Sequence, residues 1–370
     1  MLLIDNDVVR QVLTMKACIE AQEKAFLGLA DRDSVARGRI DVYVPCERPD
    51  GYFRWGTMEG ASKSLGVFAI RMKSDIVYWP HDEQGNWTEE KYCMEPGTYC
   101  GLVFLFSTRN GAPLAMINEG VLQHMRVGAG AGIGAKYLSR EDAHVVAMIG
   151  SGGMARTYLE AFSCVRDIRK VRVYSPTRSH RESYAEEMSQ KLGIDVQPVD
   201  SPALAVAGAD IVSTCTDSMV PALKGAWLEP GQHATNLGYF ETDEDVFTRA
   251  NIIVKQGMSA VFPANESDAT IEVGRGHSPV AYIAGNEEER KRLPASNRRF
   301  KTSHQYPSFV DLARGKVHGR QSREDITFYI NGGLQGLQFA AAGAVVYEEA
   351  KKRGLGREIP TQWFLQDVRD

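Results

Sequence analysis

The feature that most constrains this chain is a glycine-rich turn within the run HVVAMIGSGGMA at 144–155. The apolar residues 145–149 predict a buried strand, and the segment RTYLEAFSCV after the turn has apolar side chains at helical spacing. Strand, glycine turn and helix in this order are the context in which G-x-G-x-x-G/A binds a dinucleotide pyrophosphate. Gly150 permits the tight turn, Gly152 lets the backbone approach the phosphates, and Ala155 keeps the helix close to the strand. The flanking segments disfavour an ordinary glycine turn.

The rest of the chain divides into two patterns. Short apolar segments alternate with helical ones over 170–255, and this pitch predicts a doubly wound parallel sheet of the α/β class. Before the turn, the segment 51–74 reads as two strands, and apolar runs on both sides of TRNG predict a β-hairpin. A single helix is expected over 8–29, while 79–93 and 259–306 read as polar excursions.

Composition excludes several classes of partner. A length of 370 residues leaves room for two domains, and a formal charge of −4 gives no electrostatic reason to expect nucleic acid or an anionic membrane. No apolar run reaches transmembrane length, and the N-terminus lacks the basic region of a signal peptide. The six cysteines form no CxxC pair or His/Cys cluster, which predicts reduced thiols, no metal site and a cytoplasmic protein.

The residues after the second strand of the nucleotide-binding segment bear on cofactor choice. An acid about 20 residues after the glycines normally binds the adenosine ribose of NAD. Here Ser175 stands in that position, followed by Thr177, Arg178 and Arg181. No acid repels a 2′-phosphate and two arginines are available to hold one, so the sequence favours NADP(H), with NAD(H) possible. The alternative is that both arginines are the basic start of an exposed helix.

Two groups of cations are candidates for an anionic ligand. Side chains alternate in the strand VFAIRMK, so Arg71 and Lys73 share a face, where they repel unless something anionic meets them. A solvated edge strand would also explain them. Arg126 lies in the glycine- and alanine-rich segment 119–138, where burying it unpaired would be costly. A carboxylate is its natural bidentate partner, whether from a substrate or from an internal acid.

Taken together, these stretches resemble the ornithine cyclodeaminase/mu-crystallin family over nearly the whole length of the chain. The matching stretches are residues 2–29, HMRVGAGAGIGAKYL, VVAMIGSGGMA, VAGADIVSTCT, LEPGQHATNLG and GRQSREDITFYINGGLQGLQFAAAGAVVYEEAKKRGLG. The resemblance implies a homodimer. It also implies a Rossmann domain at 128–320, inserted into an α+β substrate-binding and dimerisation domain built from 1–127 and 321–370.

The resemblance also implies site residues. Arg126 matches the arginine that binds the substrate carboxylate, and Arg39 matches a second one, with Arg37 as a rival. The family's active-site lysine aligns with Arg71 without gaps or with Lys73 after a shift, and proton transfer favours Lys73 because arginine stays protonated. Arg54 completes the candidate substrate-binding set. The candidate cofactor-binding residues are Gly150, Gly152, Gly153, Met154, Ala155, Ser175, Thr177, Arg178, Thr214, Thr216, Leu237 and Gly238.

One departure from the family bears on the reaction. Cyclodeaminases carry an aspartate shortly after LEPGQHATNLG, where this chain has Phe240 followed by Glu241, a candidate catalytic substitute. The expected activity is therefore an NAD(P)-dependent imine reductase or amino-acid dehydrogenase. The alternatives are a cyclodeaminase, which expels ammonia using bound NAD, and a non-catalytic ligand binder similar to mu-crystallin.

Overall fold

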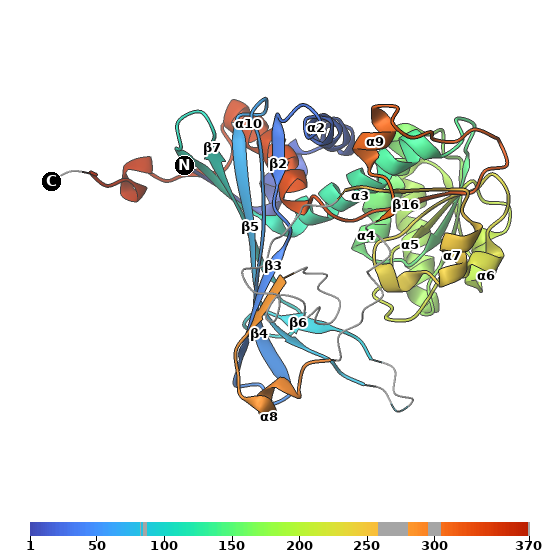
Figure 1. Cartoon of the computed structure of the whole chain (residues 1–370), viewed down its shortest axis with the longest axis horizontal. Coiled ribbons are helices and arrows are strands. Elements are labelled where there is room, and N and C mark those ends of the chain that lie inside the picture. Colours follow the sequence, from blue (N-terminus) through green and yellow to red (C-terminus); the bar gives the residue numbers. More distant parts are fainter. Residues whose placement is uncertain (82, 84–86, 258–279, 295–304, 369–370) are drawn as a thin grey trace. The chain divides into compact units, whose positions relative to one another are not determined.

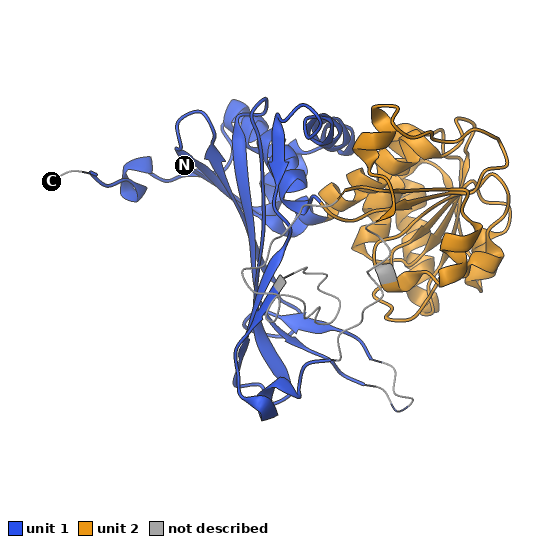
Figure 2. Cartoon of the chain, viewed as in Figure 1, with its two compact units in different colours: residues 1–123, 259–301, 334–370 blue, residues 124–258, 302–333 orange. Residues whose placement is uncertain are grey.

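The computed structural model describes residues 1–368 except 82, 84–86, 258–279 and 295–304. These residues divide into two compact units, coloured separately in Figure 2. Unit 1 comprises 1–123, 259–301 and 334–370, and unit 2 comprises 124–258 and 302–333. In the described part of the chain, no helix is both long enough and apolar enough to span a membrane.

Unit 1 is built on a large sheet (Figure 1). Its described strands have the order β15-β3-β4-β5-β7-β8-β1-β17, with β2 paired to β4 and β6 paired to β5. The strands are β1 (Leu2–Ile4), β2 (Ser34–Ala36), β3 (Ile40–Pro45), β4 (Gly51–Ser62), β5 (Val67–Tyr78), β6 (Glu90–Tyr92), β7 (Cys100–Ser107), β8 (Pro113–Asn118), β15 (Val280–Ile283) and β17 (Arg357–Glu358). The helices are α1 (Asn6–Val12), α2 (Met15–Leu27), α8 (Glu287–Arg290) and α10 (Gln335–Arg353), and η5 is Thr361–Phe364.

The two faces of this sheet differ. Helix α10 contacts β4 and β5 and packs on α2. The approach is so close that a Cβ on Gly60 would lie 2.3 Å from the Leu337 nitrogen. From Tyr52 onward in β4, and throughout β5, residues alternate between buried and half-buried, because successive residues of a strand point to opposite faces. The buried face therefore carries Arg71 and Lys73 together, as predicted.

Unit 2 is a parallel sheet covered by helices on both faces (Figure 1). The strand order is β11-β10-β9-β12-β13-β16-β14, and the strand pairs are parallel throughout. The strands are β9 (Val145–Ile149), β10 (Lys170–Tyr174), β11 (Asp195–Pro198), β12 (Ile211–Thr214), β13 (His233–Thr235), β14 (Ile252–Lys255) and β16 (Thr327–Ile330). The helices are α4 (Gly153–Val165), α5 (Arg178–Leu192), α6 (Pro202–Val206), α7 (Glu244–Arg249) and α9 (Phe309–Ala313), with η1 (Gly225–Trp227) and η2 (Tyr239–Glu241). This confirms the predicted doubly wound α/β fold.

Helix α3 (Glu119–Leu138) carries the glycine- and alanine-rich segment from unit 1 into unit 2. A Cβ on Gly128 would lie 2.5 Å from the carbonyl oxygen of Thr157 on α4, and one on Gly134 would lie 2.3 Å from the Tyr329 ring. The small residues therefore permit another helix and the sheet to approach closely, as the sequence indicated.

Two sequence-based boundaries differ from the structure. The predicted helix 8–29 is two helices, because Leu13 is extended and the Thr14 side chain accepts a hydrogen bond from the Ala17 nitrogen as the cap of α2. The domain limits also differ from 1–127, 128–320 and 321–370. Strand β15 pairs with β3 in the sheet of unit 1, whereas β16 pairs with β13 and β14 in unit 2, so the chain changes unit more often than a single insertion would require.

Candidate functional site

The glycine turn has the geometry that a dinucleotide site requires. Gly150 follows β9 with a φ of +111°, and a Cβ there would lie 2.2 Å from the carbonyl oxygen of Cys215. Gly152 caps α4 without a side-chain hydrogen bond, and a Cβ at this position would meet no atom within 4 Å. The N-terminal turn of α4, with Gly153, Met154 and Ala155, thus offers backbone N–H groups next to open space. Such a helix terminus fits a pyrophosphate.

The predicted ribose-binding residues lie at the end of β10. Ser175 is buried, and its carbonyl accepts a hydrogen bond of 2.9 Å from Arg181, which also contacts Asp200 at 2.6 Å. Arg178 is different, because its side chain is 79% exposed at the first turn of α5 and pairs with Glu182. Thr177 is the residue that caps this helix. Of the two arginines, Arg181 is therefore engaged inside the fold and Arg178 faces solvent.

Glu241 gathers the other predicted cofactor-binding residues around one carboxylate. It is fully buried and accepts hydrogen bonds from the Thr214 hydroxyl at 3.1 Å and the Thr216 hydroxyl at 2.8 Å. The backbone nitrogens of Thr216, Leu237 and Gly238 donate to it as well, the Leu237 bond being 2.9 Å long. Since these donors belong to the segments after β12 and β13, Glu241 holds the two segments together at the carboxyl edge of the sheet.

Arg126 lies on α3 within unit 2 and is 8% exposed. Burial raises the pKa of Tyr158, and the charge of Arg126 is one of the weaker influences that oppose this shift. The Tyr158 hydroxyl accepts a hydrogen bond of 2.6 Å from Asn331, which also donates to the carbonyl of Val127 at 3.1 Å. Asn331 directly follows β16, which places Arg126 beside the same carboxyl edge as the glycine turn.

The predicted basic face of unit 1 is a buried set of ion pairs. Arg39 pairs with Asp41 at 2.7 Å, and Arg71 pairs with Glu119. Arg54 donates to both oxygens of Asp75 at 2.9 Å and to Glu89 at 2.9 Å. The rival arginine, Arg37, is half-exposed and pairs with Glu59 at the surface. The cations of this face were expected to repel one another unless anions meet them. The chain itself supplies those anions, as the carboxylates of these acids.

Lys73 differs from the arginines of this face. Its Nζ lies 3.7 Å from Asp75, whose two oxygens are already engaged by Arg54. Burial, followed by the charges of Arg39 and Arg54, lowers the pKa of Lys73 well below its ordinary value. For Arg71, burial acts in the same direction, but Glu119 outweighs it and the pKa lies above the ordinary value. Of the predicted pair, Lys73 is thus the cation whose pKa is lowered, and a lysine, unlike an arginine, can release its proton.

Glycines flank Lys73 on both neighbouring strands. Gly56 of β4 and Gly101 of β7 are its register partners. A Cβ on Gly56 would lie 2.8 Å from the Lys73 side chain, and one on Gly101 would lie 2.3 Å from Glu119. The charged side chains therefore lie flat over backbone, which larger residues would prevent.

Several of these residues were not singled out from the sequence. The acids Asp75, Glu89 and Glu119 carry no local signal, because each meets its arginine only through strand pairing or a distant segment. Asp41 pairs with Arg39 two residues before it. Gly56 and Gly101 could have been found as isolated glycines inside apolar strands, a pattern that marks close approach.

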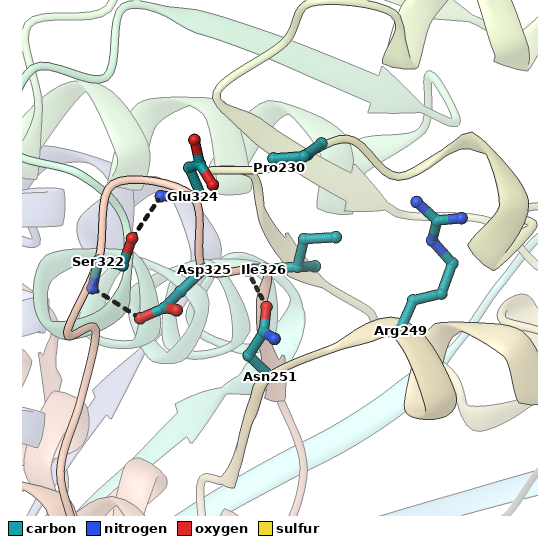
Figure 3. A pocket seen from close by; sticks show the side chains of 7 residues that line it. All are labelled: Pro230, Arg249, Asn251, Ser322, Glu324, Asp325 and Ile326. Atoms are coloured by element: carbon teal, nitrogen blue, oxygen red, sulfur yellow. Dashed lines mark hydrogen bonds between the residues drawn. The ribbon is translucent and has the colours of Figure 1, made fainter.

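A separate open pocket lies in unit 2 at the amino ends of β14 and β16 (Figure 3). Its walls are Pro230, Arg249, Asn251, Ser322, Glu324, Asp325 and Ile326. Ligands of open α/β sheets bind at the carboxyl ends of the strands. The glycine turn follows the carboxyl end of β9, so this pocket lies at the opposite edge from the candidate site.

Known proteins resemble the chain in both sequence and fold. The profile of the ornithine cyclodeaminase/mu-crystallin family matches residues 89–354. The Δ1-pyrroline-2-carboxylate reductase of Bacillus cereus is 27% identical over 71% of this chain and 74% of its own length. The reductase of that name from Thermococcus litoralis, solved with NADH and L-proline, covers 97% of this chain and 100% of its own, with a TM-score of 0.74 and 24% identity. An archaeal alanine dehydrogenase dimer with bound NAD covers 97% and 99%, with a TM-score of 0.72 and 23% identity.

Proposed function

Since the chain belongs to the ornithine cyclodeaminase/mu-crystallin family, we propose that it is an NAD(P)H-dependent oxidoreductase acting on the C=N or CH–NH2 group of a small imino or amino acid. The observation that carries this proposal is the environment of Lys73, a buried amine with a lowered pKa among paired arginines. Such an amine can hold or release the proton that accompanies imine reduction. Relatives named pyrroline-2-carboxylate reductase and alanine dehydrogenase support the same reaction class.

The cofactor would be held by the glycine turn. Backbone N–H groups of Gly153, Met154 and Ala155 would bind the pyrophosphate, with Gly152 leaving room for its approach. The nicotinamide, when bound, supplies or accepts a hydride. The segments containing Thr216 and Gly238, which Glu241 holds in place, would line the same edge of the sheet.

The substrate would be oriented by its carboxylate. We assign that contact to Arg126, because the next residue, Val127, is hydrogen-bonded to Asn331 at the carboxyl edge of the sheet and a guanidinium binds a carboxylate bidentately. Arg39 is proposed to assist. Arg54, proposed from the sequence as a third binding residue, is 1% exposed and donates to Asp75 and Glu89. We therefore propose that Arg54 acts by holding those carboxylates.

Lys73 would complete the reaction on the substrate nitrogen. In the reductive direction its ammonium donates a proton to the nitrogen as hydride reaches the carbon, which converts C=N to CH–NH. In the oxidative direction the neutral amine accepts that proton. Carboxylate orientation and proton transfer together can supply much of the rate enhancement.

Cyclodeaminase chemistry is disfavoured by the region around Phe240. This residue is apolar and 3% exposed, so it offers no carboxylate at the position where cyclodeaminases carry an aspartate. Both oxygens of the neighbouring Glu241 accept hydrogen bonds from the chain. A separate base for ammonia expulsion is therefore missing from these two positions.

The function is tested by oxidation of NADPH and NADH across two sets of compounds. One set is 2-oxo acids with ammonia or methylamine, and the other is cyclic imino acids. A reductase oxidises the cofactor in proportion to product. Product formed from a diamino acid without net cofactor turnover would instead establish a cyclodeaminase, and cofactor binding without turnover on any compound would establish a ligand binder.

We propose NADP(H) as the preferred cofactor, because Ser175 leaves no acid at the ribose and Arg178 is exposed beside it. Replacing Arg178 with alanine is expected to weaken NADPH binding by about 1–3 kcal/mol, the value of a charged hydrogen bond, and to leave NADH binding nearly unchanged. Titration calorimetry with both cofactors measures this. Arg169→Ala, which removes another exposed arginine of unit 2, is the control. Equal losses for NADPH and NADH would contradict the preference.

We also propose a homodimer, formed through the half-buried face of the large sheet. This face carries Thr57, Glu59 and Ser74, but most of its side chains are apolar. The large apolar ones are Phe53, Trp55, Phe68, Ile70, Met72, Ile76, Leu102, Phe104, Phe106 and Met116. Apolar patches of this kind mark protein interfaces. Light scattering at micromolar concentration should give twice the chain mass, and Ile70→Lys should reduce it to the monomer. A monomeric mass for the wild type would count against the proposal.

A further inference from the structure

The excursion at 79–93 carries one acid into the interior of unit 1. Strand-like pairing of His81 with Trp87 returns the chain toward the sheet. The side chain of Glu89 is then only 5% exposed. It accepts hydrogen bonds from Arg54 at 2.9 Å and from the Trp79 ring nitrogen at 3.4 Å. A segment predicted to be a polar excursion therefore contributes to the buried ion pairs around Lys73.

Arg54 is shared between two carboxylates. It donates to Asp75 through Nε and one terminal nitrogen, and to Glu89 through the other. Asp75 is the carboxylate nearest to Lys73 in the described structure, at 3.7 Å, and it is held by Arg54 rather than by Lys73. The position of the Arg54 guanidinium, and the carboxylates that neutralise its charge, therefore influence how strongly Lys73 holds its proton.

We propose that Glu89 is a positioning residue for Lys73, which acts through Arg54 to keep the Lys73 ammonium available for proton transfer. Glu89 locks the guanidinium against Asp75 and offsets its charge. This inference rests on the proposed role of Lys73 in the reaction. It gives the excursion a function in the chemistry of this chain.

The electrostatics support this assignment. Burial alone would raise the pKa of Glu89, but the charge of Arg54, followed by that of Lys73, lowers it to about 2, so Glu89 is ionised at neutral pH. The charge of Arg54 also contributes to the low pKa of Lys73. Removing the Glu89 charge would leave Arg54 less compensated and lower the pKa of Lys73 further. The other charged or titratable groups around Lys73 are Arg39, Asp41, Tyr43, Arg71, Asp75, Lys91, Tyr99 and Glu119.

The proposal is tested on Glu89→Gln, with Glu90→Gln as the matched control because Glu90 is exposed on the same segment. In full-length protein labelled with carbon-13 on lysine, the Lys73 signal is assigned with Lys73→Arg and followed against pH. E89Q should lower the Lys73 midpoint by about one pH unit, the effect of one charge a few ångströms away in a protein interior. E90Q should leave it unchanged.

Turnover provides the second readout. In E89Q the alkaline limit of imine reduction should move to lower pH by the same amount as the NMR midpoint. A lower melting temperature with an unchanged Lys73 midpoint would reduce Glu89 to a structural residue and overturn the proposal. If E89Q does not fold, Glu89→Asp is used instead, because its shorter side chain withdraws the carboxylate from Arg54. A smaller decrease of the Lys73 midpoint is then expected, and an unchanged midpoint would contradict the proposal. The NMR titration needs no substrate, so failure of the proposed function would appear separately, as a normal titration without turnover.

Discussion

Replacement of Lys73 by methionine is expected to lower kcat by about 10²- to 10⁴-fold, the contribution of a general acid or base. The melting temperature should stay close to that of the wild type. The physical reason is that Asp75 keeps both of its hydrogen bonds to Arg54 when Lys73 is removed, so no buried charge is left unpaired. Steady-state kinetics and a thermal melt measure both quantities.

Two further variants separate the alternatives at this strand. Lys73→Arg keeps the charge but loses the exchangeable proton, so it should be about as inactive as K73M. Arg71→Met removes the partner of the buried Glu119, and breaking a buried ion pair in this way costs about 3–5 kcal/mol of stability. If K73M retained activity near the wild-type level while a folded R71M variant lost it, Arg71 would take the catalytic role.

The fold of unit 2 was predicted closely from the sequence. Strands β10, β12 and β14 lie in the stretch 170–255, where short apolar segments were predicted to alternate with helical ones, because buried parallel strands are short apolar runs separated by helical segments. The glycine turn lies between β9 and α4 as predicted, since its requirements are local: a tight turn, a close approach and an open helix terminus.

Long-range pairing limited what could be predicted elsewhere. Strand β15 lies within a polar stretch, and its pairing with β3 joins residues more than 200 positions apart, which no local pattern indicates. The break between α1 and α2 was missed because helical spacing continues through it and the cap at Thr14 is a single polar residue. Residues 258–279 and 295–304 of the second excursion lie outside the described residues.

The candidate site shows the same division. The shared face of Arg71 and Lys73 follows from the period of a strand and was predicted. Arg71 is paired with Glu119 from a later segment, whereas Asp75 beside Lys73 is engaged by Arg54 of the neighbouring strand. The choice between the two cations therefore required the structure. The sequence predicts Glu241 as a catalytic acid because its neighbour Phe240 occupies the position of the cyclodeaminase aspartate. Its hydrogen bonds instead favour a role in holding together the segments proposed to bind the cofactor.

Replacement of Glu241 by glutamine is expected to destabilise the protein by about 2–4 kcal/mol, since each hydrogen bond to a charged group is worth about 1.5–3 kcal/mol. The NH2 group of glutamine is a hydrogen-bond donor, and it would face groups that themselves donate hydrogen bonds to Glu241. One carboxylate oxygen faces the hydroxyl and N–H of Thr216, and the other faces Thr214, Leu237 and Gly238. Either orientation of glutamine therefore loses at least two acceptor contacts. Urea denaturation measures the loss of stability.

The same substitution should also weaken NADH binding, because the segments containing Thr216 and Gly238 would no longer be held in place. We expect a loss of at least about tenfold in affinity, which corresponds to about 1.4 kcal/mol of binding free energy. The control is Glu244→Gln, an exposed residue three positions further along, which should change neither stability nor binding. The pH dependence of turnover distinguishes the two roles of Glu241. If Glu241 only holds the two segments together, its replacement leaves the pH limits of turnover unchanged and raises the dissociation constant of the cofactor. If Glu241 is a catalytic acid, its replacement abolishes one pH limit of turnover and lowers kcat, while stability and cofactor binding stay intact. That result would support a catalytic role for Glu241.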